Sequence, residues 1–198
     1  GNYFDNTFNV NGVRKVFPGY YTTTVTDMAV EWIRRPHAKP WLLIVGQKAP
    51  HGGPIQPEPR FERALDSFPV KLPANASDYR VSGGKPAWLE ESYPTWHGAG
   101  GPLYGQKDYG AFVRAYLATL LSVDESVGRI DAALKGSGQY DNTVVVFTSD
   151  NGFALGEHGR VDKRTAYEES LRIPLLVRYP PLTRPETVIQ DLVLSLDL

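Results

Sequence analysis

The feature that most constrains the fold is an unbroken apolar run, Val144–Phe147, which leads into Ser149-Asp150-Asn151-Gly152. The run is β-branched and aromatic, which is typical of a strand buried on both faces, as in the parallel sheet of an α/β protein. In open α/β sheets, ligands bind outside the carboxyl ends of the strands. The side-chain oxygens of Asp150 and Asn151 would then suit Ca²⁺ or Mg²⁺. Taken alone, the same residues would also fit an ordinary turn after a strand.

A second apolar run, Trp41–Val45, predicts another central strand. It leads into Gln47-Lys48-Ala49-Pro50-His51, so a histidine follows the carboxyl end of this strand too. Because such strand ends meet at one edge of a parallel sheet, we expect His51 to share a cleft with Asp150. For His51 taken alone, a surface loop position is the alternative.

Two amphipathic helices are predicted to pack against these strands. The first covers residues 22–35, where Thr26 or Asp27 could cap the start and Pro36 ends the helix. The second covers Tyr109–Lys135, in which apolar residues recur at steps of three and four. Residues 175–179 predict one further strand before a pair of prolines.

Two regions lack this regular pattern. Residues 1–19 are expected to form a loop or a short hairpin around Asn11-Gly12. Residues 54–108 are rich in proline and glycine, and a loop of this length inside a domain is usually functional or disordered. Within it we expect His97 to be a solvated loop residue, with a contact to substrate as the alternative. Four aromatic residues of this loop could face a sugar or aryl substrate, or pack beneath the loop: Trp88, Tyr93, Trp96 and Tyr104.

The composition excludes several classes of function. A chain of 198 residues can form one domain with a core, and its net charge of −1 gives no electrostatic footprint for nucleic acid. No apolar run approaches membrane-spanning length. The chain has no cysteine, which excludes disulfides and thiolate zinc sites within it.

The order of these motifs resembles the sulfatase family, the formylglycine-dependent sulfuric ester hydrolases of the alkaline-phosphatase-like superfamily. Three stretches carry the resemblance: Lys48–His51, Leu121–Arg129 and Thr148–Pro174. It extends over nearly the whole chain and implies an α/β three-layer sandwich with a central, mostly parallel sheet. It also implies that residues 1–198 are part of one catalytic domain truncated at both ends, with residues 54–108 as a long insertion on the substrate side.

The resemblance also implies roles for individual residues. Asp150 and Asn151 match the family's metal ligands for Ca²⁺ or Mg²⁺. His51 matches a histidine that binds the sulfate group, and Lys163 matches a lysine that can hold a sulfate oxygen and the leaving oxygen; both are therefore expected to be catalytic. Lys48 and His158 are expected to help bind the substrate; the alternatives are that Lys48 only covers the sheet edge with its stem and that His158 only bridges loops. That substrate would be a sulfated small molecule or glycan, with a sulfated carbohydrate favoured.

The family's nucleophile is a formylglycine made from Cys or Ser in a Cys/Ser-x-Pro/Ala-x-Arg motif. Two look-alikes, Ser67–Lys71 and Ser92–Trp96, lack the arginine, so we exclude both. The resemblance places the nucleophile and two Asp metal ligands upstream of Gly1. We therefore expect that this chain by itself does not hydrolyse an aryl sulfate.

Two alternatives remain open at the level of sequence. One is a phosphodiesterase or phosphonate monoester hydrolase of the same superfamily, and the other is a non-catalytic relative that binds sulfated glycans. By family resemblance, a periplasmic, secreted or lysosomal-type location is expected. The sequence gives no indication of the oligomeric state.

Overall fold

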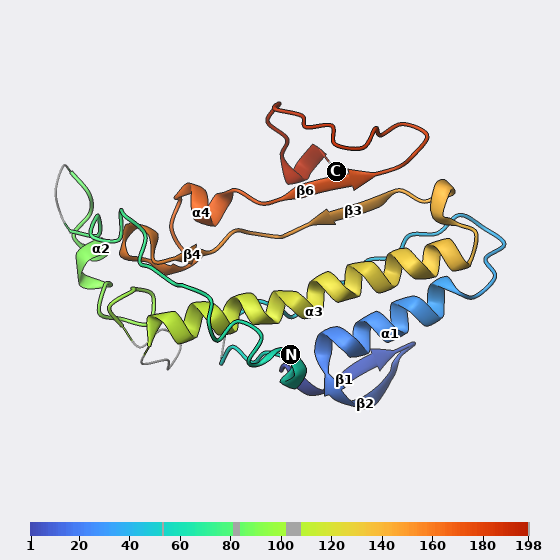
Figure 1. Ribbon diagram of the computed structural model, residues 1–198, viewed down its shortest axis with the longest axis horizontal. Coiled ribbons are helices and arrows are strands. Elements are labelled where there is room, and N and C mark those ends of the chain that lie inside the picture. The colour runs from blue at the N-terminus through green and yellow to red at the C-terminus, as the bar shows by residue number, and fades with distance from the viewer. Residues whose placement is uncertain (53, 81–83, 102–107, 198) are drawn as a thin grey trace.

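The computed structural model describes residues 1–52, 54–80, 84–101 and 108–197. Its longest element is helix α3 (Tyr109–Gly136), which runs along most of the molecule (Figure 1). Helix α1 (Tyr21–Ile33) packs against α3, with a hairpin on its outer side (Figure 1). The strands β3 (Val145–Thr148) and β6 (Leu175–Arg178) lie on the opposite side of α3 (Figure 1). The fold is thus layered around two helices.

The N-terminal hairpin consists of β1 (Phe4–Val10) and β2 (Val13–Tyr20), paired antiparallel. Asn11 and Gly12 both have positive φ, at 52° and 87°, as a two-residue Asn-Gly turn requires. The predicted hairpin is confirmed and extends through residue 20. Two phenol hydroxyls tie its base to a later loop, because Tyr3 Oη donates to His51 O (3.0 Å) and Tyr20 Oη donates to Gln56 O (3.1 Å).

Helix α1 confirms the predicted helix, but the predicted cap is wrong. The N-cap residue is Tyr20, and Thr26 and Asp27 lie inside the helix. The strand leads directly into the helix, and the Tyr21 N–H donates to Tyr3 O at 2.8 Å, so the hairpin partners this helix end. Thr26 is instead buried against α3, with its Oγ1 2.6 Å from Ser126 Oγ.

Helix α3 confirms the prediction for Tyr109–Lys135 to within a residue. Asp108 caps its start by accepting a hydrogen bond from Gly110 N at 2.8 Å. Near its other end, Ala133 and Leu134 pack against Val30 and Ile33 of α1. These buried contacts hold the two helices together as one layer.

The strand pairs of the described residues are antiparallel. β3 pairs with β6, with Val145 opposite Arg178, and β4 (Ala154–Leu155) pairs with β5 (Val161–Asp162). Parallel strands need a crossover, usually a helix of a dozen or more residues. The chain between β3 and β6 contains only α4 (Glu168–Leu171) as an α-helix, and it returns antiparallel.

The predicted burial of both apolar runs on two faces is wrong. Residues 41–45 form no strand, and Leu42 and Ile44 are each 82% exposed. Val146 of β3 is 46% exposed. The alternate residues Leu43 and Val145 pack against the helix layer. Helices therefore cover one side of these segments, and no element of the described chain covers the other.

The long loop of residues 54–108 contains two short helices in its described part, η1 (Pro59–Phe61) and α2 (Trp88–Glu91). Tyr104, one of its predicted exposed aromatics, lies outside the described residues. The remaining short helices are η2 (Tyr140–Asn142), η3 (Glu157–Gly159) and η4 (Ser195–Asp197). Among the helices described, none has the length and apolarity to cross a bilayer.

Candidate functional site

The loop after residues 41–45 presents His51 in a defined orientation. Its N–H donates to Lys48 O at 2.8 Å, and its carbonyl accepts from Tyr3 Oη at 3.0 Å. The ring Nδ1 lies 2.9 Å from Gly52 O and 3.4 Å from Lys48 Nζ. When Nδ1 donates to Gly52 O, the neutral ring presents Nε2 as its acceptor. The exposed His51 ring is thus available to an incoming molecule.

Lys48 is the cation of this loop that lies beside the His51 ring. Burial lowers the pKa of Lys48, and the positive charge of Lys163 lowers it further. A cavity of about 260 Å³ opens beside Lys48 and His51, lined by Gly1, Tyr21, Gln47, Lys48 and His51. Two of the predicted site residues, Lys48 and His51, therefore share this cavity, and Lys163 acts on Lys48 through its charge.

Asp150 and Asn151 follow β3, as predicted. Ser149 Oγ donates to Asn151 O at 2.8 Å, and Asn151 Nδ2 donates to Gly152 O at 2.6 Å. The amide oxygen of Asn151 and the exposed carboxylate of Asp150 are hard donors that fit Ca²⁺ or Mg²⁺. Two residues supply fewer than the roughly 6–8 oxygens of a Ca²⁺ site. The described residues contain no cluster of three or more His, Cys, Asp or Glu suited to a metal.

Gly152 fixes the path of the chain after these two residues. Its N–H donates to Ser170 O at 2.9 Å. A Cβ at this position would lie 2.1 Å from Glu169 O, closer than any side chain can approach. The glycine therefore lets the Asp150–Asn151 turn lie directly against α4.

His158 occupies a packed position between three segments. Its ring stacks on Tyr167 at 3.9 Å, and its Nε2 lies 3.7 Å from Glu169 Oε2. On its other side, Asn75 Nδ2 is 3.4 Å from Nε2 and Asp78 Oδ2 is 3.9 Å from Nδ1. These contacts join the long loop to α4, and the predicted substrate contact of His158 stays a prediction.

The structure adds a group that sequence reasoning missed, centred on Asp162. The buried Asp162 carboxylate lies 2.8 Å from His97 Nδ1 and 2.9 Å from Arg164 Nε. Burial alone would raise the pKa of Asp162. Hydrogen bonds from the Lys163 backbone N–H, Arg164 and His97 outweigh burial and hold that pKa below its ordinary value. His97, predicted as a solvated loop residue, is therefore a partner of a buried carboxylate.

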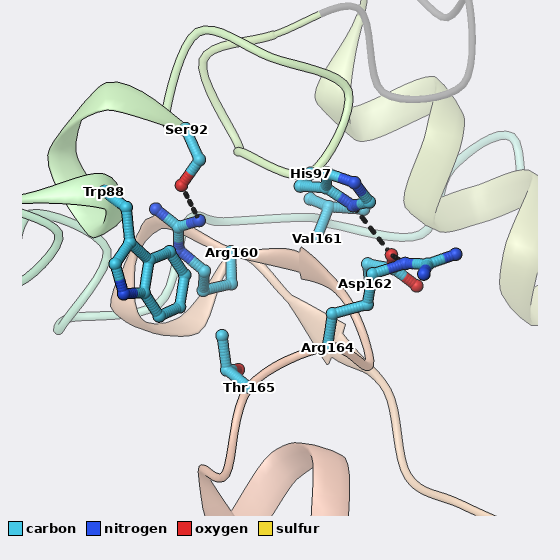
Figure 2. Close-up of a pocket in the computed structure, with 8 residues that line it drawn as sticks. All are labelled: Trp88, Ser92, His97, Arg160, Val161, Asp162, Arg164 and Thr165. Atoms are coloured by element: carbon cyan, nitrogen blue, oxygen red, sulfur yellow. Dashed lines mark hydrogen bonds and ion pairs between the residues drawn. The ribbon is translucent and has the colours of Figure 1, made fainter.

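Backbone hydrogen bonds attach the segment around His97 to β5. Val161 N donates to His97 O at 2.8 Å, and Ala99 N donates to Gly159 O at 3.0 Å. Next to His97, the Trp96 ring lies 5.4 Å from the Arg164 guanidinium carbon. Figure 2 shows His97, Asp162 and Arg164 grouped at one end of a pocket. The Asp162 carboxylate accepts hydrogen bonds from the backbone N–H of Lys163 and from the Arg164 side chain. These contacts fix the residues on both sides of Lys163.

Comparison with known proteins identifies the family to which the chain belongs. The family model described as Sulfatase matches residues 2–198. N-acetylglucosamine-6-O-sulfatase of Bacteroides thetaiotaomicron is 33% identical over 233 residues, which cover 91% of this chain and 42% of that enzyme. Human N-acetylglucosamine-6-sulfatase is 29% identical over 206 residues, which cover 99% of this chain and 35% of that enzyme.

Solved structures are similar as well. A protein in complex with its substrate, D-glucosamine-2-N,6-O-disulfate, gives a TM-score of 0.74 at 31% identity, covering 91% of this chain and 47% of that protein. The phosphonate monoester hydrolase of Agrobacterium radiobacter gives 0.67 at 26% identity, covering 84% of this chain and 35% of that one. The chain thus spans less than half of these relatives. From the family match over residues 2–198, the chain belongs to the sulfatase family and has the alkaline-phosphatase-like α/β fold.

Proposed function

We propose that this chain belongs to an enzyme that hydrolyses sulfate esters of sulfated sugars. The observation that carries the proposal is the sulfatase family match over residues 2–198, with Lys48 beside His51 in a loop that lines a cavity. Sulfate ester hydrolysis places negative charge on the sulfuryl oxygens and on the leaving alkoxide. Two ammonium groups and an imidazole supply the positive charge and the proton that this reaction needs.

Each of the three side chains has a distinct task in this proposal. Lys163 holds a sulfate oxygen and the leaving oxygen through its compact ammonium group. His51 keeps Nδ1–H on Gly52 O, so in the protonated ring Nε2 is the atom that transfers a proton to the leaving oxygen. Lys48 adds positive charge beside the His51 ring and binds the sulfate group.

Asp150 and Asn151 would hold a divalent cation, Ca²⁺ or Mg²⁺, at the end of β3. When bound, such a cation stabilises negative charge on the sulfate oxygens. The hard oxygen donors of both residues and the exposure of Asp150 support this assignment. By family resemblance, the reaction would also need two further Asp ligands and a formylglycine nucleophile, which are not among these 198 residues.

The proposed substrate class is a sulfated amino sugar. Two relatives are named for N-acetylglucosamine 6-sulfate, and a similar structure contains a disulfated glucosamine. The likeness to a phosphonate monoester hydrolase supports one competing function, the hydrolysis of phosphonate monoesters. The two functions differ in the anion that the site prefers, and binding can separate them.

Binding measurements on the 198-residue chain test the proposal without requiring turnover. Glucosamine 6-sulfate is titrated while the NMR signals of the His51 ring are followed. We expect those signals to shift, and we expect Lys163→Met to weaken binding about tenfold or more, since a charge-assisted contact contributes about 1.5–3 kcal/mol. Lys39→Met is the matched control, because Lys39 is an exposed lysine that does not line the cavity beside His51.

Two results would overturn the proposal. One is equal affinity of the Lys163→Met variant and the unmodified chain for glucosamine 6-sulfate. The other is a clear preference for a phosphonate monoester over the sulfate ester at the same His51 signals, which would favour the competing function.

A further inference from the structure

A second cavity, of about 220 Å³, lies between α2 and the chain at β5. Figure 2 shows Arg160 and Thr165 facing the same space as Trp88, with the Asp162 group at the other end. It is distinct from the cavity beside His51, since the two share no lining residue. The lining residues are Trp88, Ser92, His97, Arg160, Val161, Asp162, Arg164 and Thr165.

Arg160 is a buried cation without a carboxylate partner in the described chain. Its side chain belongs to a residue that is only 3% exposed. The guanidinium donates to two neutral oxygens, Ser92 Oγ and Leu89 O. Burial lowers the pKa of Arg160, and the Tyr167 phenol opposes this effect. Burying a charge without a counter-charge is unfavourable, so this position calls for an anion.

Two residues that line the cavity each contain a buried polar atom with no hydrogen-bond partner within the part of the chain that the structure describes. These atoms are Arg160 Nε, a donor, and Thr165 Oγ1, a donor and acceptor. Most buried polar groups in proteins are paired, so two orphan atoms on residues that line one cavity indicate a group that binds there. Both can donate to the oxygens of one anion.

The nearby carboxylate of Asp162 does not neutralise Arg160. It is committed to His97 and Arg164, which lie 2.8 Å and 2.9 Å from its Oδ2. With two arginines and one carboxylate along its wall, the cavity carries an excess of positive charge. An anionic ligand would therefore be attracted to it.

Trp88 gives the cavity an apolar wall suited to a sugar ring. It is the first residue of α2 and remains 50% exposed. An indole face packs against the C–H face of a ring while its surroundings hydrogen-bond polar groups. The anchoring of Leu89 O and Ser92 Oγ by Arg160 holds this part of α2 beside the cation.

From these observations we infer that the cavity binds an anionic substituent of a sugar, a carboxylate or a sulfate, with Arg160 Nε and Thr165 Oγ1 as donors and Trp88 as the platform for the ring. The two anions present the same oxygen acceptors to these atoms. The inference rests on the proposed function only in that the ligand would be part of a sulfated glycan, next to the sugar that loses its sulfate.

The test follows the Arg160 Nε–Hε signal by NMR in the full chain during titration. The probes are methyl glucuronide, glucosamine 6-sulfate, inorganic sulfate and neutral methyl glucoside. We expect the signal to shift with an anionic sugar and to stay unchanged with methyl glucoside. Trp88→Ala and Thr165→Val should each weaken that binding about fivefold or more. Arg63→Gln, at an exposed arginine of the same long loop, should leave it unchanged.

Arg160→Met lacks the followed signal, so its binding is measured by calorimetry, and we expect no binding. This variant also loses the contacts to α2, so the Trp88 and Thr165 variants keep the test valid if Arg160→Met unfolds. An unchanged Arg160 signal with both anionic sugars would overturn the inference. If inorganic sulfate shifts the Arg160 signal as much as the anionic sugars do, the proposed role of the sugar ring is wrong. Lys163→Met should leave this binding intact, so failure of the proposed function and failure of this site give different results.

Discussion

The imidazole Nδ1 of His97 lies 2.8 Å from the carboxylate Oδ2 of Asp162, across 65 positions of sequence. Asp162 also has a φ of 127°, an unfavourable conformation for a residue with a Cβ. Three hydrogen-bond donors hold the carboxylate of this residue. The contact therefore stabilises the turn from which Lys163 projects.

Removal of the His97 side chain should show how much its contact with Asp162 contributes to stability. We expect His97→Ala to lower the free energy of unfolding by about 1–2 kcal/mol at neutral pH, because it removes a hydrogen bond to a buried carboxylate. His97→Asn should recover part of the loss, since its amide can donate. Urea unfolding followed by circular dichroism measures both. Equal stability of the alanine variant and the unmodified chain would contradict the proposed contact.

The same carboxylate should make stability depend on pH. Its pKa is lowered on folding, so its contribution is present above the ordinary Asp pKa and is lost as the pH falls through the lowered value. Unfolding free energies measured from pH 7 down to pH 2 should fall less steeply in Asp162→Asn than in the unmodified chain. Parallel curves for the two proteins would show that Asp162 does not contribute in this way.

Residues 42–44 should respond to substitution in alternation. Leu43 packs against the helix layer, whereas Leu42 and Ile44 are exposed. We expect Leu43→Ser to lower the unfolding free energy by about 1–3 kcal/mol through lost burial. Leu42→Ser and Ile44→Ser should each stay within about 0.5 kcal/mol. Similar losses at all three positions would mean that this segment is covered on both sides.

Two glycines should behave in opposite ways when changed to alanine. At Gly152 the new Cβ would lie 2.1 Å from Glu169 O, so Gly152→Ala must shift the backbone and should lower stability by about 2 kcal/mol or more. Gly128 lies inside α3 with open space where a Cβ would stand, and Gly128→Ala should raise stability by about 0.5–1 kcal/mol. Thermal unfolding of both variants checks the pair, and a stable Gly152→Ala protein would argue against the close approach to α4.

A buried pair of hydroxyls between α1 and α3 should show energetic coupling. Thr26 Oγ1 lies 2.6 Å from Ser126 Oγ and 2.6 Å from Thr22 O. We expect Thr26→Val and Ser126→Ala each to lower the free energy of unfolding by about 1–2 kcal/mol. The loss in the double variant should be about 1 kcal/mol smaller than the sum of the two single losses. A double-mutant cycle measures this term, and strict additivity would rule out the coupling.

Local patterns in the sequence predicted the helices and the hairpin well. The spacing of apolar residues in Tyr109–Lys135 depends on neighbours three and four apart, and the turn at Asn11-Gly12 depends on two residues. The apolar run Val144–Phe147 predicted the strand that Asp150 and Asn151 follow. For these features the relevant contacts lie close together along the chain.

Contacts between residues far apart in the sequence could not be predicted from local patterns. Burial of Val146 depends on what covers its outer face, which its own apolar neighbours do not reveal. The role of Asp162 depends on His97 in a loop without periodicity, and Thr26 fits a helix cap until Ser126 is known to lie opposite it. A buried arginine such as Arg160 carries no distinguishing mark in the sequence.

Two phenol hydroxyls link the hairpin to the loop of His51 by hydrogen bonds, and these hydrogen bonds persist at alkaline pH. Burial, with the Glu58 carboxylate adding to it, raises the pKa of Tyr20 to about 12, and burial likewise raises the pKa of Tyr3. Both hydroxyls therefore keep their protons in every medium in which an enzyme ordinarily works. The first twenty residues thus hold the loop of His51 through two hydrogen bonds that stay the same over this range of pH.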